Sequence, residues 1–124
     1  MLSKPLRLKG KKRIASLFQQ GSILKLYPLY LFYLPCIAAD SHKVLFTVSR
    51  KRVRRAVTRN KLKRRMREAY RLSQANFSSD APPFLLLGYV YVGLNNEGTY
   101  ATIQEKILAS LHYLYVTQFN KVSS

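Results

Sequence analysis

The segment RAVTRNKLKRRMREAYR, residues 55–71, offers the clearest chemistry in this sequence, because eight of its seventeen residues are Arg or Lys and one is acidic. In a helix, which turns by about 100° per residue, cations at intervals of four residues share one face. Like charges at that spacing repel one another, at a cost of a few tenths of a kcal/mol for each pair. The pattern therefore favours an anion-binding face over a merely solvated one. That face comprises Arg59, Asn60, Lys63, Arg64, Arg67 and Arg71.

An apolar stripe beside these cations predicts how the segment is held in place. Leu62, Met66 and Ala69 fall on one side of the same helix, with Tyr70 at the border. We expect this stripe to pack on a sheet, which would hold the basic face rigid. Asn60 is the neutral member of that face, and its amide can order a phosphate, a water or a neighbouring side chain.

The charge of the whole chain indicates the same class of partner. Its 124 residues include 22 Lys or Arg and 5 Asp or Glu, a net charge of +17. Solubility alone needs a magnitude of about 2–8. Twelve of the basic residues lie between Arg50 and Arg71, and six lie between Lys4 and Arg13. Two basic zones on so small a chain suggest one footprint for a polyanion, with nucleic acid the leading candidate and an anionic membrane surface the other.

Groups that could catalyse a reaction are sparse. The five carboxylates are scattered along the chain, whereas a two-metal phosphodiesterase centre needs several of them around ions about 4 Å apart. His42 and His112 are distant in sequence, so a paired-histidine acid–base site is the weaker interpretation of them. The sequence has neither zinc-ligand spacing nor a phosphate-binding glycine loop. We therefore predict no catalytic residue and no metal ligand in this chain.

The single cysteine and the hydropathy pattern predict the compartment. Cys36 cannot form an intrachain disulfide, and we expect it to be a small, at least half-buried apolar residue, which fits a reducing cytosol. The most apolar stretch, 84–94, has eleven residues, whereas a membrane-spanning helix needs about 20. The N-terminus lacks the apolar run of a signal peptide. We expect a soluble, cytoplasmic protein without a membrane partner.

Periodicity and turn residues predict one small α+β domain with a three- to four-stranded mixed sheet. The expected order is helix–strand–strand–helix–strand–helix. The domain is expected over 11–120, after a basic and flexible segment 1–10 and before a tail 121–124. The predicted elements are helices over 11–21, 55–76 and 99–119, and strands over 29–34, 43–50 and 84–92.

The stretch RNKLKRRMR, residues 59–67, resembles the R-N-x-x-K-R-x-x-R signature of the bacterial ribonuclease P protein subunit. The preceding VSRKRVRRAV is similar to that family's approach from strand to helix. Upstream, RLKGKKRIASLFQQG resembles its first helix, with Phe18 and Gly21 in place, and TYATIQEKILASLHYL resembles its last. Two departures are a pair of arginines, Arg54 and Arg55, where many members have a turn glycine, and Ile14 where many have Phe.

The resemblance implies an accessory subunit of an endoribonuclease. In this family the catalyst is an RNA subunit with bound Mg²⁺, and the holoenzyme removes the 5′ leader of precursor tRNA to give the mature 5′ end. The implied partners are the catalytic RNA, in a 1:1 complex, and precursor tRNA, and Mg²⁺ would be bound mainly by the RNA. The implied fold is an α+β sandwich whose strand–helix–strand crossover has the rare left hand.

The resemblance also implies two RNA-binding surfaces. The central helix would bind the catalytic RNA, and a cleft between the first helix and the sheet would hold the single-stranded leader by stacking and backbone charge. The strand pattern adds Tyr30 and Val48 to that cleft, while Phe46 is better explained by core packing. The set for the central helix is Arg55, Arg59, Asn60, Lys63, Arg64, Arg67 and Arg71. The set for the cleft is Phe18, Phe32, Tyr30 and Val48. Further phosphate contacts are expected from Lys9, Lys11, Lys12, Arg13, Arg50 and Lys51.

Four other interpretations share parts of this pattern. A structural RNA-binding protein of the ribosomal type would have the same charge and fold class, but it would have no role in cleavage. A stand-alone nuclease is disfavoured by the scattered carboxylates. A DNA-binding basic-region helix is disfavoured because no zipper heptads follow before the loop at 78–83. A membrane-surface helix is disfavoured because the basic segment has little apolar bulk.

Overall fold

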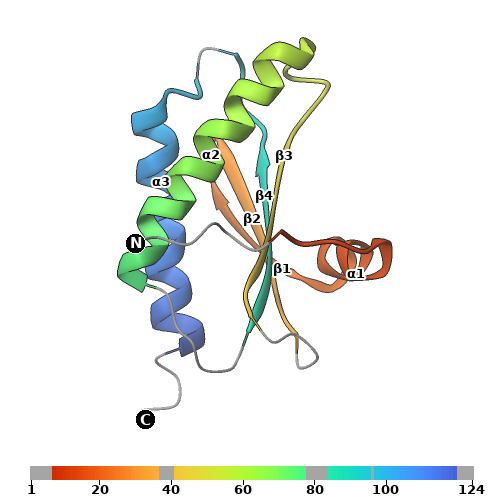
Figure 1. Cartoon of the computed structure of the whole chain (residues 1–124), viewed down its shortest axis with the longest axis vertical. Helices are drawn as coiled ribbons and strands as arrows, with labels where there is room; N and C mark the ends of the chain where they lie inside the picture. Colours follow the sequence, from red (N-terminus) through yellow and green to blue (C-terminus); the bar gives the residue numbers. More distant parts are fainter. Residues whose placement is uncertain (1–6, 37–40, 78–83, 96, 120–124) are drawn as a thin grey trace.

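The computed structural model describes residues 7–36, 41–77, 84–95 and 97–119 (Figure 1). The elements are α1 (Lys11–Gln20), β1 (Ser22–Leu26), β2 (Leu29–Pro35), β3 (Lys43–Val48), α2 (Ala56–Phe77), β4 (Leu85–Tyr91), α3 (Tyr100–Leu114) and a short π-helix η1 (Tyr115–Phe119). A four-stranded mixed sheet, ordered β1-β2-β4-β3, lies between helices. Strands β1 and β4 both pair antiparallel with β2, whereas β3 and β4 are parallel neighbours joined through α2.

Strand β1 is absent from the order that the sequence predicts. It pairs with β2 so that Leu26 faces Leu29, and the connection is the tight turn Tyr27–Pro28. As an edge strand it exposes most of its residues, including Ile23. The alternation that marks a half-buried strand is therefore weak there. The element order is αβββαβα, within the expected α+β class and mixed sheet.

The helices divide between the two faces of the sheet, with α2 and α3 on one face and α1 on the other (Figure 1). The larger core lies under α2 and α3. It contains the predicted stripe of α2, since Leu62, Met66 and Ala69 are almost completely buried, and Tyr70 joins them. Side chains of β2, β3 and β4 complete it, and α3 contributes Ile103, Ile107, Leu111 and Leu114. Burying this stripe fixes which side of α2 faces outward.

A smaller core lies between α1 and the opposite face of the sheet. Leu17 of α1 is completely buried there against Leu86, with Cys36 packed half-buried beside them. Gly88 of β4 makes the close approach possible. A Cβ at that position would lie 2.9 Å from Leu17 Cδ2 and 3.2 Å from Phe18 Cζ. The absence of a side chain at Gly88 therefore lets Leu17 and Phe18 of α1 pack directly on β4.

The described end of the N-terminal segment is part of the fold. Leu8 is 1% exposed and its N–H donates to the Val44 carbonyl at 2.9 Å. The segment 1–10, which the sequence sets apart from the domain, thus contacts the sheet at Leu8, and 1–6 lie outside the described residues. The tail 121–124 also lies outside them. No helix in the described part of the chain is both long and apolar enough to cross a membrane.

Candidate nucleic-acid interface

The outward side of α2 carries most of the predicted cations. Asn60, Arg64 and Arg67 are exposed and Lys63 is half-buried, on the side away from the buried stripe. A shallow groove of about 380 Å³ runs along this surface. It is lined by Val57, Asn60, Lys61, Lys63, Arg64 and Arg67. Since none of these six residues is acidic, the groove is a positively charged surface on a rigid helix.

Arg59, which the sequence predicts to contact RNA, forms hydrogen bonds within the protein. Its Nη1 donates to the Val53 carbonyl at 3.1 Å and to the Arg54 carbonyl at 2.6 Å. Val53 is completely buried, and its N–H donates to the Ser49 carbonyl. Arg59 therefore ties the turn between β3 and α2 to the first turn of the helix. Arg54 and Arg55 lie in this turn, and both are exposed.

Two other arginines of α2 bond to the protein itself. Arg71 pairs with Glu68, with Nη2 2.5 Å from Oε1 and Nε 3.2 Å from Oε2. The hydrogen bonds from Arg71 lower the pKa of the Glu68 carboxyl, so Glu68 stays charged near neutral pH. Arg65 donates to the Gly98 carbonyl at 2.6 Å, which connects α2 to the loop before α3. The outward charge is thus concentrated in the cations that line the groove, Lys61, Lys63, Arg64 and Arg67.

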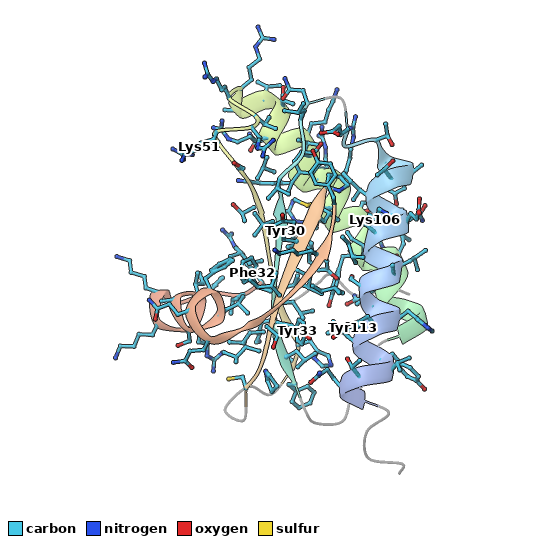
Figure 2. The ribbon with its side chains drawn as sticks, turned by 180° about the vertical axis from the view of Figure 1, so that it is seen from behind. Tyr30, Phe32, Tyr33, Lys51, Lys106 and Tyr113 are labelled. Atoms are coloured by element: carbon cyan, nitrogen blue, oxygen red, sulfur yellow. The ribbon has the colours of Figure 1, made fainter. Side chains whose placement is uncertain are left out.

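The face of the sheet on which α1 lies brings together three of the four predicted cleft residues. The rings of Phe18 and Phe32 meet edge to face, with centroids 4.8 Å apart. Tyr30 lies on the same face farther from α1 (Figure 2). The Lys25 ammonium lies 5.7 Å from the centre of the Tyr30 ring. Across the sheet, Tyr30 of β2 is paired with Lys25 of β1 and with Val90 of β4, and Val90 is paired with Thr47 of β3. These four residues form one row beyond α1, in which Lys25 is exposed and the other three are half-buried.

The prediction that Val48 belongs to this face is wrong. Val48 is 5% exposed and lies in the core under α2 and α3. Side chains alternate along a strand, so Val44, Phe46 and Val48 share one face, and contact with α2 makes it the core face. Phe46 stacks on Tyr89 with centroids 5.7 Å apart. The predicted core packing of Phe46 is therefore confirmed.

The remaining predicted cations border the α1 side of the molecule. Lys9, Lys11 and Lys12 are exposed, and Arg13 is half-buried. Arg50 and Lys51 are exposed in the turn after β3, and Figure 2 shows Lys51 on the same side of the sheet as α1. Arg55 is exposed just before α2, where its carbonyl accepts from the Arg59 N–H at 3.0 Å. Cations of α1 and of the turn after β3 therefore border the face that carries Phe18, Phe32 and Tyr30.

The described residues contain no group of three or more His, Cys, Asp or Glu that could hold a metal ion. His42 accepts a hydrogen bond from the Leu85 N–H at 3.0 Å and packs edge-on against Phe84. His112 lies on α3, exposed. What this arrangement offers chemically is binding: phosphate by cations and unstacked bases by aromatic rings.

Sequence reasoning missed Arg7 and Lys25. Arg7 lies at the edge of β3 near Lys63 and Arg67, and Lys25 lies over Tyr30 in a strand that was not predicted. The alternation of Leu24, Lys25 and Leu26 is a weak signal for β1 and for the outward side of Lys25, because it spans only three residues.

Comparison with known proteins gives one consistent family. The family model described as Ribonuclease P matches residues 2–114. A "Ribonuclease P protein component" of Chlorobaculum tepidum is 45% identical over 71 residues, which cover 53% of this chain and 46% of the relative. One of Porphyromonas gingivalis is 41% identical over 78 residues, covering 59% and 55%. The chain thus spans about half the length of the curated relatives it matches.

Solved structures give the same result for the fold. The RNase P protein of Staphylococcus aureus superposes with a TM-score of 0.72 at 19% identity, covering 89% of this chain and 95% of that one. That of Thermotoga maritima, in complex with 1-(4-fluorophenyl)-2-thiourea, superposes with a TM-score of 0.69 at 25% identity, covering 85% and 96%. The α+β fold with its four-stranded mixed sheet is therefore shared with these proteins.

Proposed function

The chain belongs to the ribonuclease P protein family, and on that premise we propose that it acts as the protein subunit of ribonuclease P. In this proposal it binds the catalytic RNA 1:1 in the cytoplasm and holds the 5′ leader of precursor tRNA. It thereby assists Mg²⁺-dependent removal of the leader.

The observation that carries the proposal is the outward face of α2. Lys63, Arg64 and Arg67 lie on a helix that a buried stripe holds against the sheet. Cations fixed in this way bind phosphates without ordering a flexible segment first, and they release counterions from the RNA. They also reduce the repulsion between two RNA strands brought close together. Asn60, exposed among them, can bridge a phosphate or a ribose.

The α1 side of the sheet supports the proposed leader site. A leader of variable sequence has to be held by stacking and backbone charge rather than by base-edge readout. Tyr30 and Phe32 offer rings on one face of β2, and Lys25, Lys51 and the lysines of α1 offer charge around them. Phe18 supports Phe32 from the side. Base–aromatic stacking contributes roughly 1–3 kcal/mol for each base.

In this proposal the catalytic centre lies in the RNA subunit, which supplies the Mg²⁺ chemistry. The residues of this chain bind and orient: the face of α2 holds the catalytic RNA, and the α1 side holds the leader. The described residues offer no carboxylate cluster, so no step of cleavage is assigned to them.

The test is cleavage of a precursor tRNA at low Mg²⁺ by the protein alone, by a bacterial catalytic RNA alone and by both together. Cleavage at the mature 5′ end mainly in the mixture is the expected result. Cleavage by the protein alone would contradict the accessory role. Tight RNA binding with no effect on cleavage would favour a structural RNA-binding protein instead.

A further inference from the structure

The described residues cover only part of the outer edge of β3. Arg7 forms a parallel bridge with Val44, and the Leu8 N–H donates to the Val44 carbonyl. The chain then turns away into α1 at Gly10, whose φ is 97°. Among the described residues, the bond from the Leu8 N–H to the Val44 carbonyl is the last backbone hydrogen bond along that edge. After Val44, no described residue forms a backbone hydrogen bond on the outer side of β3.

The backbone of Phe46 points to this outer edge. The Val44 carbonyl faces outward to Leu8, whereas the Ser49 N–H faces inward and donates to the Tyr91 carbonyl of β4 at 3.0 Å. In a strand, the backbone groups of alternate residues point to opposite sides. Residues 44, 46 and 48 thus present their N–H and C=O groups outward. No backbone group of the described residues accepts a hydrogen bond from the Phe46 N–H, and an edge N–H of this kind is a ready hydrogen-bond donor.

A pocket of about 160 Å³ lies at this edge between β3 and α2. We call it the edge pocket. It is lined by Arg7, Val44, Leu45, Phe46, Lys63 and Arg67. Three of its six lining residues are cations and none is acidic. Its volume is well below the roughly 300–1,000 Å³ of pockets that enclose drug-sized ligands, so it suits a small anion.

We propose that the edge pocket binds one backbone phosphate of RNA. The Phe46 N–H acts as a fixed donor, and Arg7, Lys63 and Arg67 neutralise the charge. Lys63 and Arg67 are one helical turn apart, so a strand lying on α2 passes the pocket without leaving the helix. The inference rests on the proposed function and deepens it, because it extends the RNA footprint from α2 to the edge of the sheet and to Arg7.

Hydrogen exchange at the Phe46 amide tests this directly, measured at single-residue resolution in the full chain. The arms are the free protein, the protein with the catalytic RNA and the protein with a single-stranded leader oligonucleotide. We expect one of the two RNAs to slow exchange about tenfold or more, which also identifies the source of the phosphate. RNA binding is checked separately, by affinity or by slower amide exchange around Asn60 and Arg64 of α2. If RNA binds but exchange at Phe46 is unchanged with both RNAs, the edge pocket is overturned and the proposed function is left intact. Absence of any RNA binding would overturn both.

Two further measurements keep the result unambiguous. Inorganic phosphate should shift the Phe46 amide resonance downfield in a saturable way, and Lys63→Gln/Arg67→Gln should abolish the shift. Arg7→Gln should make the salt dependence of log affinity for the identified RNA less steep by about one, whereas Lys106→Gln on α3 should leave it unchanged. A phosphate shift that survives loss of both α2 cations, or an equal effect of Arg7→Gln and Lys106→Gln, would contradict the proposal.

Discussion

Single cations on α2 differ in what they contact, and the difference predicts unequal effects of substitution. Arg64 is exposed on the outward face, whereas Lys106 is half-buried on α3. We expect Arg64→Gln to weaken binding of the catalytic RNA by about 1 kcal/mol, roughly fivefold. Lys106→Gln is the control and should change affinity less than twofold. Both affinities are measured by equilibrium titration at one salt concentration. Equal losses in the two variants would mean that Arg64 contributes no more to RNA binding than Lys106 does, which would contradict the assignment of RNA binding to this face of α2.

Substitution of Arg59 distinguishes a residue that stabilises the fold from one that contacts RNA. Arg59→Lys keeps the charge but loses the planar guanidinium that reaches the carbonyls of Val53 and Arg54. We expect the free energy of unfolding to fall by about 1 kcal/mol and amide exchange at 53–55 to accelerate. Chemical denaturation and hydrogen exchange measure both. Unchanged stability together with an affinity loss like that of Arg64→Gln would make Arg59 a phosphate contact alone.

Residue types and spacing predicted the outward cations but not which of them bond within the protein. A helical wheel places Arg59 beside Lys63 because it describes one helix in isolation. The carbonyls that Arg59 meets belong to the preceding turn, whose path depends on tertiary packing of Val53. Arg7 was missed for the same reason, since its partners lie in β3 and α2.

At the scale of elements, the fit of α1 against the sheet depends on Gly88. A methyl group there would meet the buried Leu17 and the ring of Phe18. We expect Gly88→Ala to displace α1 and to lower the free energy of unfolding by about 1–3 kcal/mol, as overpacking does. Because α1 borders Phe32, affinity for a leader oligonucleotide should fall more than affinity for the catalytic RNA. Equal losses for the two RNAs would indicate that α1 does not shape a separate leader surface.

The sequence predicted long, strongly periodic elements and missed what depends on the partner of a strand. Helix α2 and its stripe follow from Leu62, Met66 and Ala69 at helical spacing. Strand β1 escaped notice because an exposed edge strand has little alternation. Val48 was placed on the wrong surface because alternation groups the residues of β3 into two sets without saying which set faces α1.

At the scale of the whole molecule, a net charge of +17 makes the free protein repel itself. Salt screens this repulsion over a Debye length of about 10 Å at 0.1 M. We therefore expect Tm of the free protein to rise by a few degrees as NaCl increases, while affinity for RNA falls. Calorimetry over a salt series measures the first effect. A Tm that is constant or falls with salt would mean that the ion pairs of the fold outweigh its self-repulsion.

The central claim, that the outward face of α2 binds the phosphates of the catalytic RNA, is tested most directly by the salt dependence of that affinity. We would compare the wild-type chain with Lys63→Gln/Arg64→Gln/Arg67→Gln. The outward cations at and along α2 are Arg55, Lys61, Lys63, Arg64 and Arg67. With about five phosphate contacts from them, log affinity against log salt should have a slope of roughly −3.5 to −4.5, and losing three cations should make it less negative by roughly 2–3. The same slope in both proteins, or a slope near zero in the wild type, would contradict the account.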